Sequence, residues 1–246
     1  MSKRTSLSLK IFVSVTFLLL VGTAILAACG SSSGTATASS SSSTSSSSTT
    51  TQPSGPGGGG GSNARSGPAS GGASGTVSNV STSGFTLTTS AGQKVTVDEA
   101  SSTTYQNGTI SISASAITNG ESVLVLGTVN TTNGTTIAAT QVIVQPTGSG
   151  GSAASSAAGV VPFQRGAPTT SKQVGQIPAN YSQGSGTIVS GTTANKATEA
   201  ALAAYPGGVV DRVVKLSNGE YEVHNIGVNW PHHVFVNQNF KVVGAD

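Results

Sequence analysis

Three histidines lie close together near the end of the chain, and imidazole is the side chain that most commonly binds metal ions. They are the only histidines in the sequence: His224, His232 and His233. Adjacent residues on a strand point to opposite faces, so His232 and His233 are not expected to reach one ion from regular β structure. The nearby carboxylates are those of Asp211, Glu220 and Glu222. We therefore expect a polar, partly exposed loop held by Trp230-Pro231 and no metal site; a site formed by His224, His232 and His233 is the alternative.

No pattern in the sequence indicates catalysis. The serines lie mostly in low-complexity segments, and none stands in a nucleophile-elbow motif. Asp98 and Glu99 are adjacent and would point to opposite faces of a strand, whereas Glu220 and Glu222 would share a solvated face. The GGGGG run is not followed by Lys-Ser/Thr, so it is not a phosphate loop. We expect no enzyme, no catalytic residue and no cofactor apart from covalent lipid.

The only cysteine, Cys29, follows a segment with the pattern of an export signal. Lys3, Arg4 and Lys10 are basic, residues 11–26 are mostly apolar, and Ala27-Ala28 are small. This order is typical of a cleaved signal peptide, and the apolar run is short for a spanning helix of about 20 residues. Removing residues 1–28 takes away three of the 11 basic residues, which leaves 8 against 8 acidic residues. A nearly neutral exported chain predicts no nucleic-acid partner.

Leu26-Ala27-Ala28-Cys29 resembles the bacterial lipobox. The resemblance implies cleavage between Ala28 and Cys29, a diacylglyceryl group on Cys29, and anchoring at the outer face of the cell membrane. Gly30 lacks the Asp-type retention signal, so the outer membrane is implied for a host with two membranes. The alternative is a free or buried cysteine after an ordinary signal peptide.

Residues 29–74 are rich in Ser, Thr, Gly, Ala and Pro, and their composition predicts a disordered tether, with sugars on the hydroxyls as a hypothesis. From Gly75 to 146, short alternating runs predict a small all-β barrel or sandwich. Phe85 and Leu87 share one face, as do Val95 and Val97. Predicted turns lie at Asn107-Gly108, Asn119-Gly120 and Asn133-Gly134.

Residues 75–146 resemble an uncharacterised barrel-like domain of exported bacterial proteins. The matching segments are Gly75-Thr76-Val77, Gly84-Phe85-Thr86-Leu87, Gly92-Gln93-Lys94-Val95, Gly120-Glu121-Ser122-Val123 and Val125-Leu126-Gly127. The resemblance implies a fold and no activity. Residues 147–190 are predicted to be a linker, with apolar islands at 160–163 and 177–178 that either dock on a neighbouring domain or lie extended.

Residues 191–246 predict a small α+β unit. A helix is expected over 192–204, with Thr192 or Thr193 as its N-cap, an alanine stripe on one face, and Pro206-Gly207-Gly208 as its stop. Strands are expected at 209–216, 220–228 and 234–243, with a turn at Ser217-Asn218-Gly219.

This last segment resembles a PepSY domain. The resemblance rests on the order of four runs: Lys196-Ala197-Thr198-Glu199-Ala200-Ala201-Leu202, Tyr205-Pro206-Gly207-Gly208, Val213-Val214-Lys215-Leu216 and Gly219-Glu220-Tyr221-Glu222-Val223. It implies an exported protein with a protease-inhibiting or regulatory role. The sequence departs from the family's acidic residue and glycine turn at 236–240.

Trp230, the only tryptophan, is expected to be a core anchor or an exposed anchor for a protein partner. Tyr221 and Phe235 or Phe240 are its expected companions, so Tyr221, Trp230 and Phe235 are the candidate partner-binding residues. The sequence thus predicts a non-catalytic, lipid-anchored envelope protein whose PepSY-like domain binds or regulates an exported protein, such as a peptidase. The alternatives are an envelope spacer or glycan-contacting lipoprotein and, third, a histidine-based metal binder.

Overall fold

The computed structural model describes residues 68–132, 135–146 and 149–246. Cys29, the signal segment, most of the predicted tether and the Asn133-Gly134 turn lie outside these ranges. The described residues belong to one compact unit of the chain. Within them the fold is mostly β, with two α-helices.

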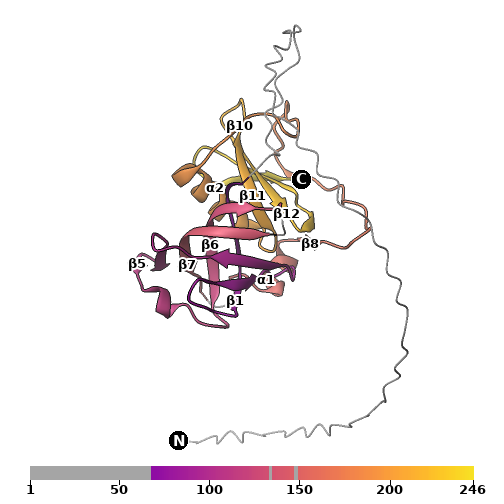
Figure 1. The fold of residues 1–246 in the computed structure, drawn as a ribbon. Helices are drawn as coiled ribbons and strands as arrows, with labels where there is room; N and C mark the ends of the chain where they lie inside the picture. The colour runs from indigo at the N-terminus through magenta and orange to yellow at the C-terminus, as the bar shows by residue number, and fades with distance from the viewer. Residues whose placement is uncertain (1–67, 133–134, 147–148) are drawn as a thin grey trace, which may run out of the picture. The chain divides into compact units, whose positions relative to one another are not determined.

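Five strands close into a barrel (Figure 1). They are β1 (Ala69–Ser78), β2 (Gly84–Thr88), β3 (Lys94–Asp98), β7 (Thr136–Val144) and β6 (Ser122–Asn130). Each is antiparallel to the next, except that β3 and β7 run parallel, and β6 returns to pair with β1 along most of its length. The all-β prediction for this region is therefore confirmed as a closed barrel.

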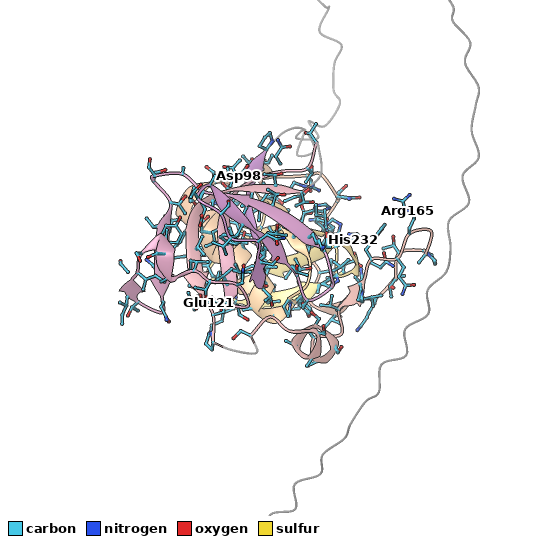
Figure 2. The ribbon with its side chains drawn as sticks, turned by 60° about the horizontal axis from the view of Figure 1, so that its bottom comes forward. Asp98, Glu121, Arg165 and His232 are labelled. Atoms are coloured by element: carbon cyan, nitrogen blue, oxygen red, sulfur yellow. The ribbon has the colours of Figure 1, made fainter. Side chains whose placement is uncertain are left out.

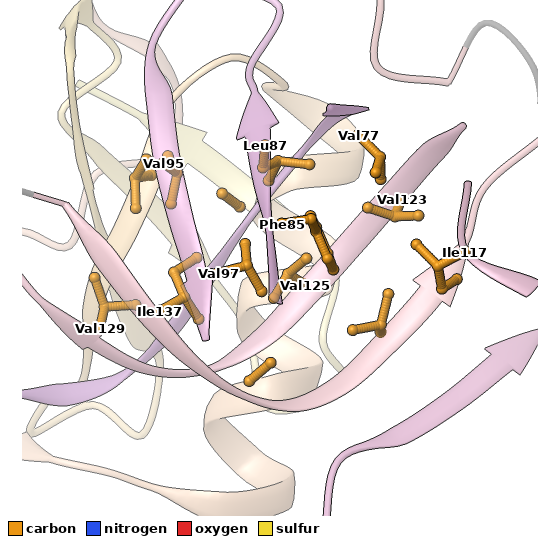
Figure 3. Packing of buried hydrophobic residues seen from close by; sticks show 14 residues of the cluster. Val77, Phe85, Leu87, Val95, Val97, Ile117, Val123, Val125, Val129 and Ile137 are labelled. Carbon is orange, nitrogen blue, oxygen red and sulfur yellow. The ribbon is translucent and has the colours of Figure 1, made fainter. Parts of the chain in front are cut away.

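Alternating side chains fill the barrel (Figure 3). Phe85, Leu87, Val95 and Val97 are all buried in it, as their spacing predicts. Because inward positions recur every second residue along a strand, short runs of valine and leucine are enough to build this core. The labelled members in Figure 3 are Val77, Phe85, Leu87, Val95, Val97, Ile117, Val123, Val125, Val129 and Ile137.

Short elements extend the barrel at one edge. β4 (Thr104–Asn107) pairs in parallel with the second half of β7, and β5 (Ile110–Ser111) pairs with β4. A 3-10 turn, η1 (Ala114–Ala116), follows. Gly108 and Gly120 have φ of 60° and 90°, which confirms turns at Asn107-Gly108 and Asn119-Gly120.

Strand β6 is buried on both faces. Val123 and Val125 point into the barrel, while Leu124 and Leu126 pack outward in a second core with the main helix. The run Val123 to Leu126 therefore shows no polar alternation, because both of its faces are covered.

The main helix is α2 (Gly191–Ala204). It begins one residue before the predicted Thr192, and Ser190 stands at the N-cap position without a side-chain cap hydrogen bond, so the predicted threonine caps are wrong. Ala197 and Ala201 of the predicted stripe are buried. Small side chains on this face let the helix lie close to β6 and to the C-terminal strands, with which they share a core.

The C-terminal sheet contains β11 (Val209–Lys215), β12 (Tyr221–Ile226), β14 (His233–Val236) and β15 (Val242–Ala245), in that order. Two predicted strands are each divided. The run 220–228 breaks at Gly227, whose φ is 75°, before β13 (Val228–Trp230). The run 234–243 folds into a hairpin, because the Asn237 side chain accepts hydrogen bonds from the backbone N–H of Asn239 and of Lys241.

Strand β1 joins the barrel to the C-terminal sheet. Gly72 is paired with Leu126 of β6 on one side and with Val210 of β11 on the other. A Cβ atom on Gly71 would lie 2.0 Å from the carbonyl oxygen of Val210, so the strands can approach this closely only at glycine. β1 thus begins at Ala69, before the predicted Gly75, because backbone pairing with β6 needs no apolar alternation.

Residues 149–190 carry short elements that pair with the rest of the fold: α1 (Ser152–Ala157), β8 (Val161–Pro162), β9 (Val174–Gly175) and β10 (Thr187–Ile188). Strands β8, β9 and β10 pair with β13, β15 and β11 respectively. Ile177 and Tyr181 pack on Val214, Leu216 and Phe235. Val160-Val161 of the first apolar island and Ile177 of the second are therefore docked, whereas Phe163 is exposed. We call residues 172–190 the strap, since they cover the sheet face opposite α2.

Candidate functional site

The largest described cavity is an open groove of about 1150 Å³ between the barrel and the first turns of α2. We call it the amide groove. Its floor is formed by Leu126 on β6 and Ile143 on β7. Six side-chain carboxamides line it: Gln106, Asn107, Asn119, Gln141, Gln145 and Asn195.

The strand periodicity explains why these residues converge. Val142 points into the barrel, so Gln141 and Ile143 face outward on β7. β4 lies beside this part of β7 and brings Gln106 next to Gln141, whose Nε2 donates to Gln106 Oε1 at 3.0 Å. The exposed turns at Gly108 and Gly120 form the outer rim.

Three charged residues stand on the rim: Glu121, Lys196 and Glu199. Glu121 accepts a hydrogen bond from the backbone N–H of Thr118. Each carboxamide offers both a donor and an acceptor, so the groove suits a ligand that alternates the two. The apolar floor adds a surface for aliphatic groups of the same ligand.

The three histidines gather on the strap face of the C-terminal sheet. His224 of β12 pairs across the sheet with His233 of β14, and their ring centroids lie 5.2 Å apart. His232 is 6.4 Å from His233 and 6.5 Å from His224. The opposite-face rule used for adjacent histidines does not apply here, because β14 begins only at His233 and His232 lies in irregular chain before it.

Carboxylates hold two of these rings. Nδ1 of His224 lies 2.6 Å from Oδ1 of Asp211, and Nδ1 of His233 lies 2.7 Å from Oε1 of Glu222. Asp211 sits at an irregularity in the β11–β12 pairing, which places it beside His224, and it also forms an ion pair with Arg212 at 3.3 Å. Glu222 is completely buried, whereas Glu220, which the sequence places on the same face, is not.

Burial and charge shift two pKa values in this cluster. Burial raises the pKa of Tyr181, and the negative charge of Glu222 raises it further; the Tyr181 hydroxyl lies 3.0 Å from Nδ1 of His233. Burial lowers the pKa of His232, and the neighbouring His224 and His233 lower it further, against a hydrogen bond with the Asn225 backbone. His232 is thus biased towards its neutral form.

The three aromatic candidates for partner binding are all buried. Trp230 and Phe235 have no exposed surface, and Tyr221 is 9% exposed and stacks on Phe240. The ring contact of Trp230 is with Tyr205 and not with the predicted Tyr221. A buried ring cannot contact a partner without rearrangement of the core, so these residues are excluded from the binding surface.

Sequence reasoning did not find the amide groove. Its residues come from four separated segments, and single Asn and Gln residues in β-rich sequence look like turn or surface positions. Within the described ranges, no three His, Cys, Asp or Glu side chains are already arranged around a metal position. No helix in the same ranges is long and apolar enough to cross a membrane.

Comparisons with protein-family models, with curated proteins and with solved structures found no match to this chain. The amide groove and the histidine cluster are therefore interpreted from their own geometry.

Proposed function

We propose that this chain is a lipid-anchored, non-catalytic envelope protein that binds an extended segment of an exported protein in the amide groove. The observation that carries the proposal is the convergence of six carboxamides around an apolar floor. The peptide groups of an extended chain alternate N–H and C=O, and carboxamides can pair with both. The side chains of such a segment would contact Leu126 and Ile143 on the floor.

Two features favour a polypeptide over a glycan. None of the described residues that line the amide groove is aromatic, so a sugar ring has no flat surface to stack on there. β5, near the groove rim, pairs only with β4, and Ile110 on it is 68% exposed. An edge strand next to a groove is a common docking place for an extended peptide, because the peptide adds a further strand.

The resemblance to PepSY domains supports the same kind of partner. Thr192, Asn195, Lys196 and Glu199 form one wall of the groove, and all four lie in the PepSY-like segment. By that resemblance the partner class includes secreted peptidases, which this protein would restrain or localise. The rim holds two carboxylates and one ammonium group, so the partner segment is expected to be close to neutral.

The anchor in this proposal is the lipid on Cys29. Its support is the sequence alone: a basic and then apolar leader, Ala27-Ala28 before the thiol, and a long Ser/Thr/Gly-rich segment after it. Such a tether would let the groove reach partners at some distance from the membrane surface.

Site-specific photocrosslinking in living cells tests the groove. A photoreactive amino acid replaces Asn107 on the barrel side or Lys196 on the helix side, both of which are exposed; exposed Asp98, which does not line the groove, is the matched control. We expect both groove positions to yield the same exported protein and Asp98 to yield none. Fatty-acid labelling of the same cells reports the lipid, with Cys29→Ala as its control.

A blocking variant separates binding from proximity. Asn195→Trp fills the amide groove and is expected to reduce the adduct at Asn107 about 10-fold or more, whereas Thr128→Trp, at an exposed position outside the groove, leaves it unchanged. Equal adducts at Asp98 and at the groove positions would contradict the proposal. Co-sedimentation with purified cell-wall polymer that Asn195→Trp abolishes would assign the groove to a glycan instead.

A further inference from the structure

We infer that His224, His232 and His233 together bind one divalent transition-metal ion of the zinc type. This site is separate from the amide groove: Figure 2 shows His232 and Glu121 on different sides of the ribbon. The inference rests on the positions, hydrogen bonds and charge balance of the histidine cluster, and it does not depend on the proposed function.

The spacing of the rings is close to that of a three-histidine site. Around a tetrahedral zinc ion with nitrogens at about 2.0–2.1 Å, imidazole centroids lie roughly 5 Å apart. His224 and His233 already have that separation, at 5.2 Å. His232 is 6.4–6.5 Å from the other two, so it must move towards them by about 1 Å. Its partly exposed position before β14 leaves room for that movement.

The hydrogen bonds of His224 and His233 engage Nδ1 and leave Nε2 as the nitrogen that can bind a metal ion. Asp211 holds Nδ1 of His224, and Glu222 holds Nδ1 of His233. A carboxylate that accepts from Nδ1–H fixes the neutral tautomer with its lone pair on Nε2, and the same carboxylate–histidine pairing is found behind metal-binding histidines in general. The third ring, that of His232, has a hydrogen bond with the Asn225 backbone that helps to hold it beside the other two.

The charges of the cluster also match a divalent cation. Three carboxylates, those of Asp211, Glu222 and Asp246, interact with these rings or with Tyr181, and Arg212 supplies a permanent positive charge in the same place. Three carboxylates against one guanidinium leave an excess of two negative charges among these four groups in a largely buried place. Buried charge of one sign is costly, and an ion of charge two would balance it. In addition, Oε2 of Glu222 is buried without a hydrogen-bond partner.

Isothermal titration of the full chain, purified in detergent and stripped of metal with a chelator, tests the inference with Zn²⁺ as the probe. We expect one ion per chain with a dissociation constant in the micromolar range or below. His232→Ala is expected to weaken binding about 10-fold or more, and Asp98→Asn, a carboxylate change outside the cluster, to leave it unchanged. Co²⁺ should give the visible absorption bands of a tetrahedral site.

Two results would overturn the inference. One is the absence of saturable Zn²⁺ binding to the folded chain; the other is binding that is equally tight in His232→Ala. Thermal unfolding of the metal-free variant checks that His232→Ala is folded, and His232→Gln provides a second variant if it is not. Because His224 and His233 each pair with a carboxylate, the loss of His232 should disturb the metal-free fold least of the three.

Discussion

Replacing Trp230 with alanine is expected to lower the free energy of unfolding by about 3–5 kcal/mol, the usual cost of removing a large buried aromatic side chain. Trp230 is completely buried, and its Nε1–H donates to the carbonyl oxygen of Lys172 at 2.7 Å. Tyr205 meets the ring edge-on at 5.4 Å, and the Lys172 ammonium lies 4.2 Å from the ring centroid. The indole thus fastens the start of the strap to the end of α2, and urea unfolding of the full chain measures its contribution.

Two controls separate the contributions of Trp230. Phe163→Ala removes an aromatic ring that is 59% exposed, and is expected to change stability by less than about 0.5 kcal/mol. Trp230→Phe keeps a ring but leaves the Lys172 carbonyl without its donor, at a cost of about 1–3 kcal/mol. If Trp230→Ala were as mild as Phe163→Ala while partner crosslinking was lost, the residue would be a binding anchor and the buried arrangement would be wrong.

The parts of the fold that could be predicted are those in which one residue type repeats at the period of its element. In β2 and β3, apolar residues at every second position indicate which face is buried: Phe85 and Leu87, and Val95 and Val97. The start of β1 could not be predicted in this way. Gly71 and Gly72 have no side chain, so they show no alternation of apolar and polar residues. Their role is to let β6 and β11 approach β1 closely from both sides.

The candidate sites were harder to predict because their residues are brought together by pairing between distant strands. Asp211 meets His224 only because β11 pairs with β12, and Glu222 meets His233 only through the β12–β14 register. The sequence identified the three histidines and named Asp211 and Glu222 among the nearby carboxylates, but it did not show which carboxylate pairs with which ring. For the amide groove, it showed neither the parallel β4–β7 pairing nor the placement of α2, so Gln106, Gln141 and Asn195 could not be connected.

Replacing His233 with leucine in metal-free buffer is expected to destabilise the fold by about 3–5 kcal/mol, because it leaves a buried carboxylate without its partner. Glu222 has no exposed surface; one of its oxygens lies 2.7 Å from Nδ1 of His233, and the other has no hydrogen-bond partner in the described structure. Glu222→Leu is expected to cost less, about 1–3 kcal/mol, since His233 can remain neutral and loses only a hydrogen bond.

The double variant Glu222→Leu/His233→Leu provides the decisive comparison. Replacing both members of a buried charged pair with apolar residues of similar size is often neutral or stabilising, so most of the loss caused by His233→Leu should be recovered. The cycle of four proteins, each unfolded in urea with a chelator present, then gives the coupling between the two side chains. Recovery in the double variant would mean that the Glu222–His233 pair contributes little net stability. The role of Glu222 would then be to orient the ring of His233. A double variant that is less stable than His233→Leu would instead give Glu222 a stabilising partner other than His233, and Tyr181 and Arg212 are the neighbours in the cluster to examine for it.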